Sequence, residues 1–327
     1  MATYKEIKGT RIQVLSSDPP APELGQVWYN SPGSAFKGFL LGAASWATGG
    51  TMTLPRVYLA GTGTQTAGLA MSGFRVSPNA RVADTEEYNG ASWTNGNNLP
   101  SIRDSGAGTG IQTAALMVGG FNPSNTTLTT TDEYDGTNWT SGGALPSGSK
   151  QQGCSGTQTA ALNYGGLVPP YVATTNEYNG ASWTAGGALS TARAYMAGSG
   201  PQTASLSSGG GTPGGVTAES EEYNGASWSA GGDLITARSL ARGGGDSSSA
   251  FVASGSPTPG PNTATEVYDG TSFSASTAIP TGSLYAAGAG TTAAGLFFGG
   301  NGAPPGTTGA TFEFTGPAPA TKTISTS

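Results

Sequence analysis

Histidine is absent from this 327-residue chain, cysteine occurs once, and charged residues make up only 10% of the sequence. Without histidine the chain cannot build a Ser–His–Asp or Cys–His catalytic centre, and it lacks the commonest transition-metal ligand. The single cysteine, Cys154, permits neither an internal disulfide nor a CxxC zinc site. We therefore expect no metal, no cofactor and no enzymatic activity.

Basic residues and long apolar runs are also scarce. The chain has 13 Lys and Arg against 19 Asp and Glu, a net charge of −6, which disfavours nucleic acid and anionic membranes as partners. No apolar run approaches the ~20 residues of a membrane-spanning helix, and the initial MATYKEIKGT lacks the apolar core of a signal peptide. We expect synthesis in the cytoplasm, no secretory leader and no membrane insertion.

The chain does contain a repeated sequence motif of about eight residues, which we call the phrase. A period of about 45 residues indicates a repeat architecture. From the aromatic anchor of each copy to a glycine about 27 residues further on, the copies align without a gap, so length varies only before the next tyrosine. The copies are EEYNGASW, DEYDGTNW, NEYNGASW, EEYNGASW and EVYDGTSF, with Tyr88, Tyr134, Tyr178, Tyr223 and Tyr268, followed by a degenerate FEFTG that contains Phe314.

Each repeat is predicted to form four short antiparallel strands. The Asn-Gly or Asp-Gly pair between Tyr and Trp favours a type I′ hairpin turn, in which both central residues need positive φ. Small-residue segments such as 103–110 and apolar segments such as ALMV at 115–118 supply two more strands. Such sheets bury both faces when they pack radially. Cys154 occupies an inner-strand position that is otherwise glycine, and we interpret it as a small buried substitute.

The two incomplete copies predict how the array closes. Six inner segments follow the Arg or Ser positions at 56, 103, 149, 193, 238 and 283. The copy around Trp46 has no inner strands before it, and the FEFTG copy has no Trp strand after it. We therefore predict six blades, with the N-terminal strand around Trp46 completing the last one and removing the exposed sheet edges.

The pattern resembles the kelch-type β-propeller over roughly residues 38–316. The resemblance rests on the double-glycine strand ends, the Tyr and Trp signature, and the stretch with Leu99, Pro100 and Arg103, although the Tyr–Trp spacing is shorter than is usual for kelch. It implies an all-β, six-bladed kelch-like β-propeller of four-stranded antiparallel blades. We assign residues 1–35 to an N-terminal arm, 36–316 to the propeller and 317–327 to an extended or mobile C-terminal tail.

The N-terminal arm does not repeat. A strand QVWYN, a turn SPGS and a strand AFKGFLL predict a β-hairpin after a Pro-rich stretch. The run DPPAPELGQVWYN resembles a short N-terminal element of structural proteins of tailed-bacteriophage particles. This resemblance implies that residues 1–35 attach the propeller to other virion proteins. The alternative is a plain β-arm that packs on the propeller.

Two sets of residues are candidates for a site. We interpret four arginines at one repeat position as structural, paired with repeat acids such as Glu87 and Glu133, rather than as a converging clamp for a carboxylate or sulfate. Arg242 and Asp246 are unique to their copy, and nothing marks them as a pair. Loops between second and third strands share one face and carry recognition more readily than the scaffold. The arginines are Arg56, Arg103, Arg193 and Arg238, and the ligand-binding candidates in the loops are Phe74, Arg75, Arg81, Phe121, Asn122 and Tyr171.

These features favour a non-enzymatic structural or display protein of a tailed-phage virion, as a fibre, decoration or receptor-binding module with the propeller facing outward. Its expected partners are other virion proteins, a glycan or protein of the host surface, and further copies of itself in a homo-oligomer. The alternatives are a lectin or glycan-processing enzyme that uses the propeller face, and an intracellular kelch scaffold that binds proteins.

Overall fold

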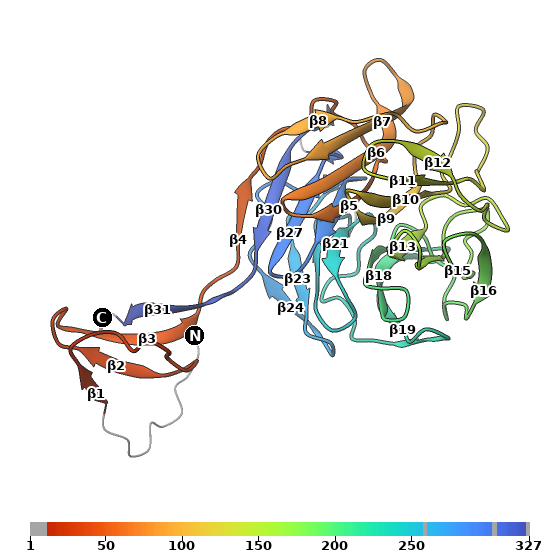
Figure 1. The fold of residues 1–327 in the computed structure, drawn as a ribbon. Coiled ribbons are helices and arrows are strands. Elements are labelled where there is room, and N and C mark those ends of the chain that lie inside the picture. The colour runs from red at the N-terminus through yellow and green to blue at the C-terminus, as the bar shows by residue number, and fades with distance from the viewer. Residues whose placement is uncertain (1–11, 258–259, 303–305, 325–327) are drawn as a thin grey trace. The chain divides into compact units, whose positions relative to one another are not determined.

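The computed structural model describes residues 12–257, 260–302 and 306–324, and every regular element within them is a β-strand. The chain divides into two compact units (Figure 1). The smaller comprises Met1–Ala44 with Gly316–Ser327, and the larger is Ser45–Thr315.

The larger unit contains six four-stranded antiparallel sheets in its described residues. The strands of the first three are β5 (Ala60–Thr64), β6 (Ala67–Arg75), β7 (Ala80–Tyr88) and β8 (Trp93–Asn95); β9 (Ala107–Ile111), β10 (Ala114–Val118), β11 (Thr131–Tyr134) and β12 (Trp139–Ser141); and β13 (Gly153–Gly156), β14 (Ala161–Tyr164), β15 (Thr175–Tyr178) and β16 (Trp183–Gly186).

The strands of the other three are β17 (Ala197–Ser199), β18 (Ser205–Thr212), β19 (Gly215–Tyr223) and β20 (Trp228–Ala230); β21 (Arg242–Gly245), β22 (Ala250–Ala253), β23 (Thr265–Tyr268) and β24 (Phe273–Ser276); and β26 (Ala287–Gly290), β27 (Ala294–Phe298), β30 (Thr311–Thr315) and β4 (Ser45–Thr48). A small three-stranded sheet also forms from β25 (Ser283–Leu284), β28 (Asn301–Gly302) and β29 (Gly306–Thr307).

The first strands of the six sheets surround a common axis. β5, β9, β13, β17, β21 and β26 each contact the next, and β26 contacts β5 again, so the contacts close into a ring. Figure 1 shows the sheets arranged radially, as in a β-propeller. Side chains have little room at the axis: a Cβ on Gly61 would lie 2.6 Å from the Ala287 Cβ, and a Cβ on Gly244 would lie 2.4 Å from the Gly290 carbonyl oxygen.

The sheet of β26, β27, β30 and β4 joins the two ends of the repeat array. Its outer strand comes from the start of the unit, and Trp46 pairs in register with Phe314. The predicted pairing of the Trp46 copy with the FEFTG copy is therefore present. The pairing matters because an open array would leave strand edges free to bind other chains.

Aromatic and aliphatic side chains fill the space between neighbouring sheets. The tyrosine and tryptophan of one phrase lie with ring centroids 4.8 Å apart in Tyr134–Trp139 and Tyr178–Trp183. The Tyr134 and Trp139 rings pack with buried side chains of the preceding sheet, such as Leu69. The repeated tryptophan is therefore core between sheets.

The turn within the phrase differs from the predicted type I′ hairpin. Tyr88 pairs directly with Trp93, which leaves four residues in the loop, and only Gly90 has positive φ, at 87°. The side-chain oxygen of Asn89 instead accepts the backbone N–H groups of Ala91 and Ser92 at 3.0 and 2.9 Å. The prediction was wrong because the Tyr–Trp spacing requires a longer loop, which the Asn or Asp side chain caps.

The smaller unit is a four-stranded sheet in the order β1 (Gln13–Leu15), β2 (Val27–Asn30), β3 (Ala35–Leu41) and β31 (Pro319–Ile324). The predicted hairpin is present as β2 and β3. The predicted boundary at 35/36 falls inside β3, so the unit continues to Ala44. The predicted C-terminal tail is not a separate segment either. Its strand β31 pairs along β3 and supplies hydrogen-bond partners for the backbone groups at the edge of β3. Residues 1–11 of the predicted arm and 325–327 of the predicted tail lie outside the described residues.

Candidate functional site

The four repeat arginines are buried, and each lies just before the first strand of a different sheet. Each is 0% exposed and pairs with the acid two residues before the tyrosine of its own sheet. The predicted partners, Glu87 and its equivalents, are one residue further on, and successive strand residues point to opposite faces. The pairs are Arg56–Glu86, Arg103–Asp132, Arg193–Glu221 at 2.9 Å and Arg238–Glu266 at 2.8 Å.

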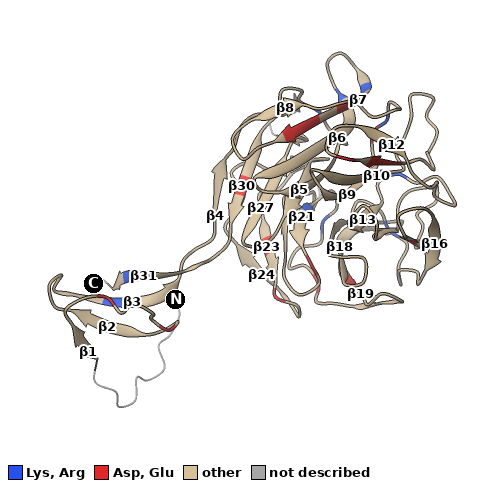
Figure 2. Ribbon diagram, viewed as in Figure 1, with Lys and Arg blue, Asp and Glu red and all other residues tan. Residues whose placement is uncertain are grey.

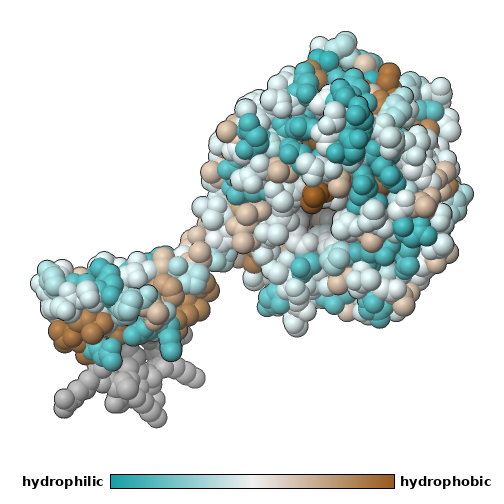
Figure 3. Space-filling model, in the orientation of Figure 1, coloured by the Kyte–Doolittle hydropathy of each residue, from teal (hydrophilic) through white to brown (hydrophobic). Residues whose placement is uncertain are grey.

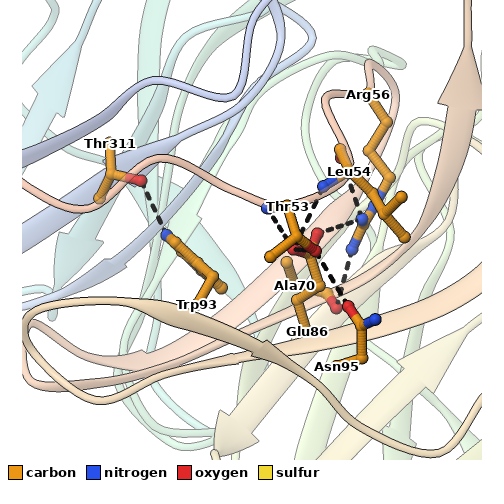
Figure 4. A network of polar contacts seen from close by, with 8 residues as sticks. All are labelled: Thr53, Leu54, Arg56, Ala70, Glu86, Trp93, Asn95 and Thr311. Carbon is orange, nitrogen blue, oxygen red and sulfur yellow. Dashed lines mark hydrogen bonds and ion pairs between the residues drawn. The ribbon is translucent and has the colours of Figure 1, made fainter.

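Figure 4 shows the first of these pairs. The Arg56 guanidinium also donates to the carbonyl oxygens of Leu54 and Ala70, both at 3.2 Å, and Glu86 accepts the backbone N–H of Thr53 at 2.7 Å. Burial lowers the pKa of Arg56, and the Glu86 charge opposes that shift. The pair therefore fixes the segment before β5 against β7 and is not free to bind a ligand.

The second acid of each phrase connects neighbouring sheets. The Tyr178 hydroxyl donates to Glu133 of the preceding sheet at 2.6 Å, and Tyr88 donates to Glu313 at the same distance. Burial and this hydrogen bond raise the pKa of Tyr178 to about 12. Equivalent bonds join Tyr134 to Glu87, Tyr223 to Glu177 and Tyr268 to Glu222. Both acids of the phrase therefore belong to the scaffold, and in Figure 2 they lie along the strands, as on β7.

One residue from each repeat lies at one end of the axis, and five backbone hydrogen bonds join these six residues from one repeat to the next. Each lies two positions after the repeat Arg or Ser and has left-handed φ between 55° and 63°. Backbone N–H groups donate to the carbonyl of the neighbouring sheet's equivalent residue, for example Tyr58 to Tyr285 at 3.0 Å and Gln151 to Ser105 at 2.7 Å. We call this set the axial ring: Tyr58, Ser105, Gln151, Tyr195, Leu240 and Tyr285.

The axial ring holds non-glycine residues in a backbone conformation that they rarely adopt. Left-handed φ costs an L-residue roughly 1–2 kcal/mol, and such strain persists only where surrounding structure imposes it. Here the hydrogen bonds between sheets impose it. Three of the six members are tyrosines, and the rings of Tyr58 and Tyr285 lie with centroids 4.0 Å apart.

A first cavity of about 330 Å³ lies beside the axial ring. Arg81 forms an ion pair with Asp104 at 2.9 Å, and the Lys150 Nζ lies 3.7 Å from the Phe121 ring centroid. Burial raises the pKa of Asp104, and the Arg81 charge opposes this shift. The cavity therefore combines aromatic surface with cationic and acidic groups. It is lined by Tyr58, Phe74, Arg81, Asp104, Ser105, Phe121, Lys150, Gln151 and Tyr195.

A second cavity of about 360 Å³ shares Tyr195 with the first. Tyr171, Tyr195, Leu240 and Tyr285 line it together with residues of the β18–β19 hairpin. Because Tyr195 belongs to both cavities, the two form one aromatic region around the axial ring.

Four of the six loop candidates lie in this region. Phe74, Arg81 and Phe121 line the first cavity and Tyr171 lines the second, whereas Arg75 and Asn122 line neither. The side chain of Asn122 instead accepts the backbone N–H of Thr126 at 2.9 Å and stabilises its own loop.

Sequence reasoning missed the tyrosines of the axial ring. An alignment of the repeats does reveal them, because three of the six copies have tyrosine two positions after the repeat Arg or Ser: Tyr58, Tyr195 and Tyr285. Among the described residues, no cluster of three or more acidic, cysteine or histidine side chains could hold a metal ion. The described part of the chain also has no helix able to span a membrane.

No protein-family model matches this chain, and no curated protein is significantly similar to it. Solved structures do match. The chain is similar to YjhT, with a TM-score of 0.67 and 13% sequence identity over 83% of this chain and 99% of that chain. At this identity the likeness concerns the fold alone. Together with the repeated four-stranded antiparallel sheets, it supports a β-propeller fold.

Proposed function

We propose that residues 45–315 are a six-bladed propeller of the kelch-like type, carried by a non-enzymatic display protein of a tailed-phage particle. The six sheets, the cyclic contacts of their first strands and the closing pair Trp46–Phe314 support the blade number. The proposed location is the virion, where the small unit binds other virion proteins and the propeller faces outward.

The phage-like run of the small unit is held together by its own side chains. Asp18 accepts the Trp28 indole N–H at 3.0 Å, the Asn30 amide at 2.8 Å and the Lys37 ammonium at 2.9 Å. Trp28 is 0% exposed. These contacts fold the Pro-rich loop onto one face of the sheet, which gives the small unit a defined structure of its own.

The proposal rests on the exposed apolar residues of the opposite face of this sheet. Val14, Tyr29, Phe36 and Ile324 stand in register across the four strands and therefore share one face. Val14 is 68% exposed and Phe36 is 37% exposed. Figure 3 shows apolar residues gathered along one side of the small unit. An exposed apolar surface of this kind is typical of an interaction site, and we assign it to another protein of the particle.

Incorporation into particles tests this proposal. The double variant Ile12→Asp/Val14→Asp adds one charge to the exposed edge strand β1 and one to the residue just before it. The control Ile235→Asp adds one charge at a position that is 60% exposed on the larger unit. We expect wild type and Ile235→Asp in purified particles, and at least a tenfold loss of the folded double variant. Equal incorporation of all three would contradict the attachment role. Neighbouring genes for capsid, portal and tail proteins would support it independently.

A second candidate function is carbohydrate binding, and the aromatic region around the axial ring favours it. Sugar sites combine aromatic surfaces with a few placed polar groups, and the first cavity offers Tyr58, Tyr195, Arg81 and Lys150. A glycan array with wild type, Tyr195→Asn and Arg75→Ala tests it. Asparagine tolerates the left-handed backbone, so loss of binding by this variant alone would support a lectin. Hydrolysis of a bound glycan would instead indicate a glycan-processing enzyme.

A further inference from the structure

One inner-strand position breaks the repeat. Four residues after each repeat Arg or Ser, five sheets have a small residue, and β21 alone has an arginine. All of these residues except Ala197 line one small cavity between the inner strands. The six residues are Ala60, Ala107, Gly153, Ala197, Arg242 and Ala287.

The Arg242 side chain lines a cavity of about 60 Å³ on the axis, and it is the only charged residue among those that line it. Its guanidinium donates to two backbone carbonyl oxygens, at 2.9 Å in Ala241 and 3.4 Å in Met196. Among the described residues no carboxylate lies within ion-pair distance of it. Burial lowers the pKa of Arg242 to about 10, so the group remains protonated at neutral pH.

Neighbouring groups supply no counter-charge. Cys154 also lines the cavity, but burial raises the pKa of its thiol to about 12, so the thiol is neutral. Asp246, the other residue unique to this copy, accepts the backbone N–H groups of Ser248 and Ser249 in its own turn. Asp104, near the axial ring, is paired with Arg81. In the part of the chain that the structure describes, Arg242 is therefore a cation at the axis without a counter-charge.

We propose that the axial cavity binds a small monovalent anion, of the size of chloride, at Arg242. The Arg242 side chain is partly buried and lines the cavity, where an anion would supply the opposite charge that no carboxylate among the described residues supplies. The cavity has room for a monatomic anion with a few waters and is too small for a sugar ring. This site is independent of the attachment and carbohydrate roles proposed above. Because an anion would bind only the closed ring, it would stabilise the folded propeller by mass action.

Thermal unfolding in sodium chloride and in sodium gluconate at equal ionic strength tests the site, because gluconate is too large for the cavity. Arg242→Ala restores the residue of the other repeats, and Arg75→Ala removes an equal charge from a loop. With about 200 mM chloride in place of gluconate, we expect Tm to rise by roughly 2–4 °C in wild type and Arg75→Ala, and to stay unchanged in Arg242→Ala. An unchanged wild type, or an equal rise in Arg242→Ala, would overturn the proposal.

Crystals of the wild-type protein grown with sodium bromide give a second measurement that does not depend on any variant. An anomalous bromide peak beside the Arg242 guanidinium is expected. A channel without a peak at that position would also overturn the proposal.

Discussion

At the residue scale, buried polar groups of the repeat occur as matched pairs. Where Ser149 and Ser283 replace the repeat arginine, the acid positions of the same sheets hold Asn176 and Phe312. Where Phe314 lacks the tyrosine hydroxyl, the acceptor position of the preceding sheet holds Val267 instead of glutamate. A polar group left without its partner on burial costs more than the loss of both. The chain itself therefore supplies control substitutions.

Tyr134→Phe removes the hydroxyl that Glu87 accepts, and we expect a loss of about 1–2 kcal/mol in the free energy of unfolding. The double variant Glu87→Val/Tyr134→Phe copies the natural Val267–Phe314 pair and should recover most of that loss. Urea unfolding of the single and double variants measures the coupling. Simple additivity of the two single losses would show that the hydrogen bond does not contribute as described.

Arg103→Ala leaves Asp132 buried without its counter-ion, and we expect a loss of about 3–5 kcal/mol. Arg103→Ser/Asp132→Asn copies the natural Ser149–Asn176 combination and should be considerably more stable than the alanine variant. Denaturant midpoints at neutral pH compare the two. If the double variant were the less stable one, the acid would not depend on the arginine.

At the element scale, strands are joined by side chains that reach backbone groups of a neighbouring element. Gln112 donates to the carbonyl oxygens of Gly68 at 2.9 Å and Tyr88 at 2.8 Å in the preceding sheet. Equivalent bonds to the preceding sheet are made by Gln65, Gln158 and Gln202. In the small unit, Asp18 has this role between its loop and β2 and β3. Such bonds fix the loops that the strands alone would leave free.

The Asp18 contacts predict a pH dependence of the small unit. Hydrogen bonds from Lys37, Asn30 and Trp28 lower the pKa of Asp18 from 3.8 to about 2. Because the pKa of Asp18 is lower in the folded state than in the unfolded state, ionised Asp18 stabilises the folded small unit. This stabilisation is fully present above pH 3.8 and is lost as the pH falls through 2. The Trp28 indole N–H resonance should shift with a midpoint near 2. Asp18→Asn should show no such titration, and a midpoint at 3.8 in wild type would contradict the contacts.

At the scale of the whole molecule, closure of the array depends on four residues. β4 supplies the outer strand of the last sheet, and its Ser45 pairs with Thr315 at the other end of the unit. Without β4, the edge of β30 would expose unpaired backbone groups. The smaller unit depends in the same way on β31 from the far end of the chain.

Transfer of β4 tests closure directly. Residues 49–315 alone should unfold at a lower temperature than 45–315 and should associate through the β30 edge. A permuted chain in which a short Asn-Gly turn joins Thr315 to Ser45, with β4 at the new C-terminus, should recover the stability because the two residues already pair. Circular dichroism melts and size-exclusion chromatography measure both effects. Equal stability of 49–315 and the permuted chain would show that closure contributes little.

The sequence by itself determined the parts of this protein that depend on local periodicity. The spacing of Tyr, Trp and glycine predicted repeated four-stranded antiparallel sheets, and the incomplete copies at Trp46 and Phe314 predicted their own pairing. These features follow from alternation along a strand and from small residues where strands crowd together.

Only the tertiary structure decided which side chains meet. A shift of one residue along a strand reverses its face, so the structure paired Arg56 with Glu86 and gave Glu87 to the next sheet's tyrosine. It also brought Tyr58, Tyr195 and Tyr285 together around the axis, added β31 to the small sheet and left Arg242 without a counter-charge. These contacts join residues far apart in the chain, and their geometry is set by how whole sheets pack.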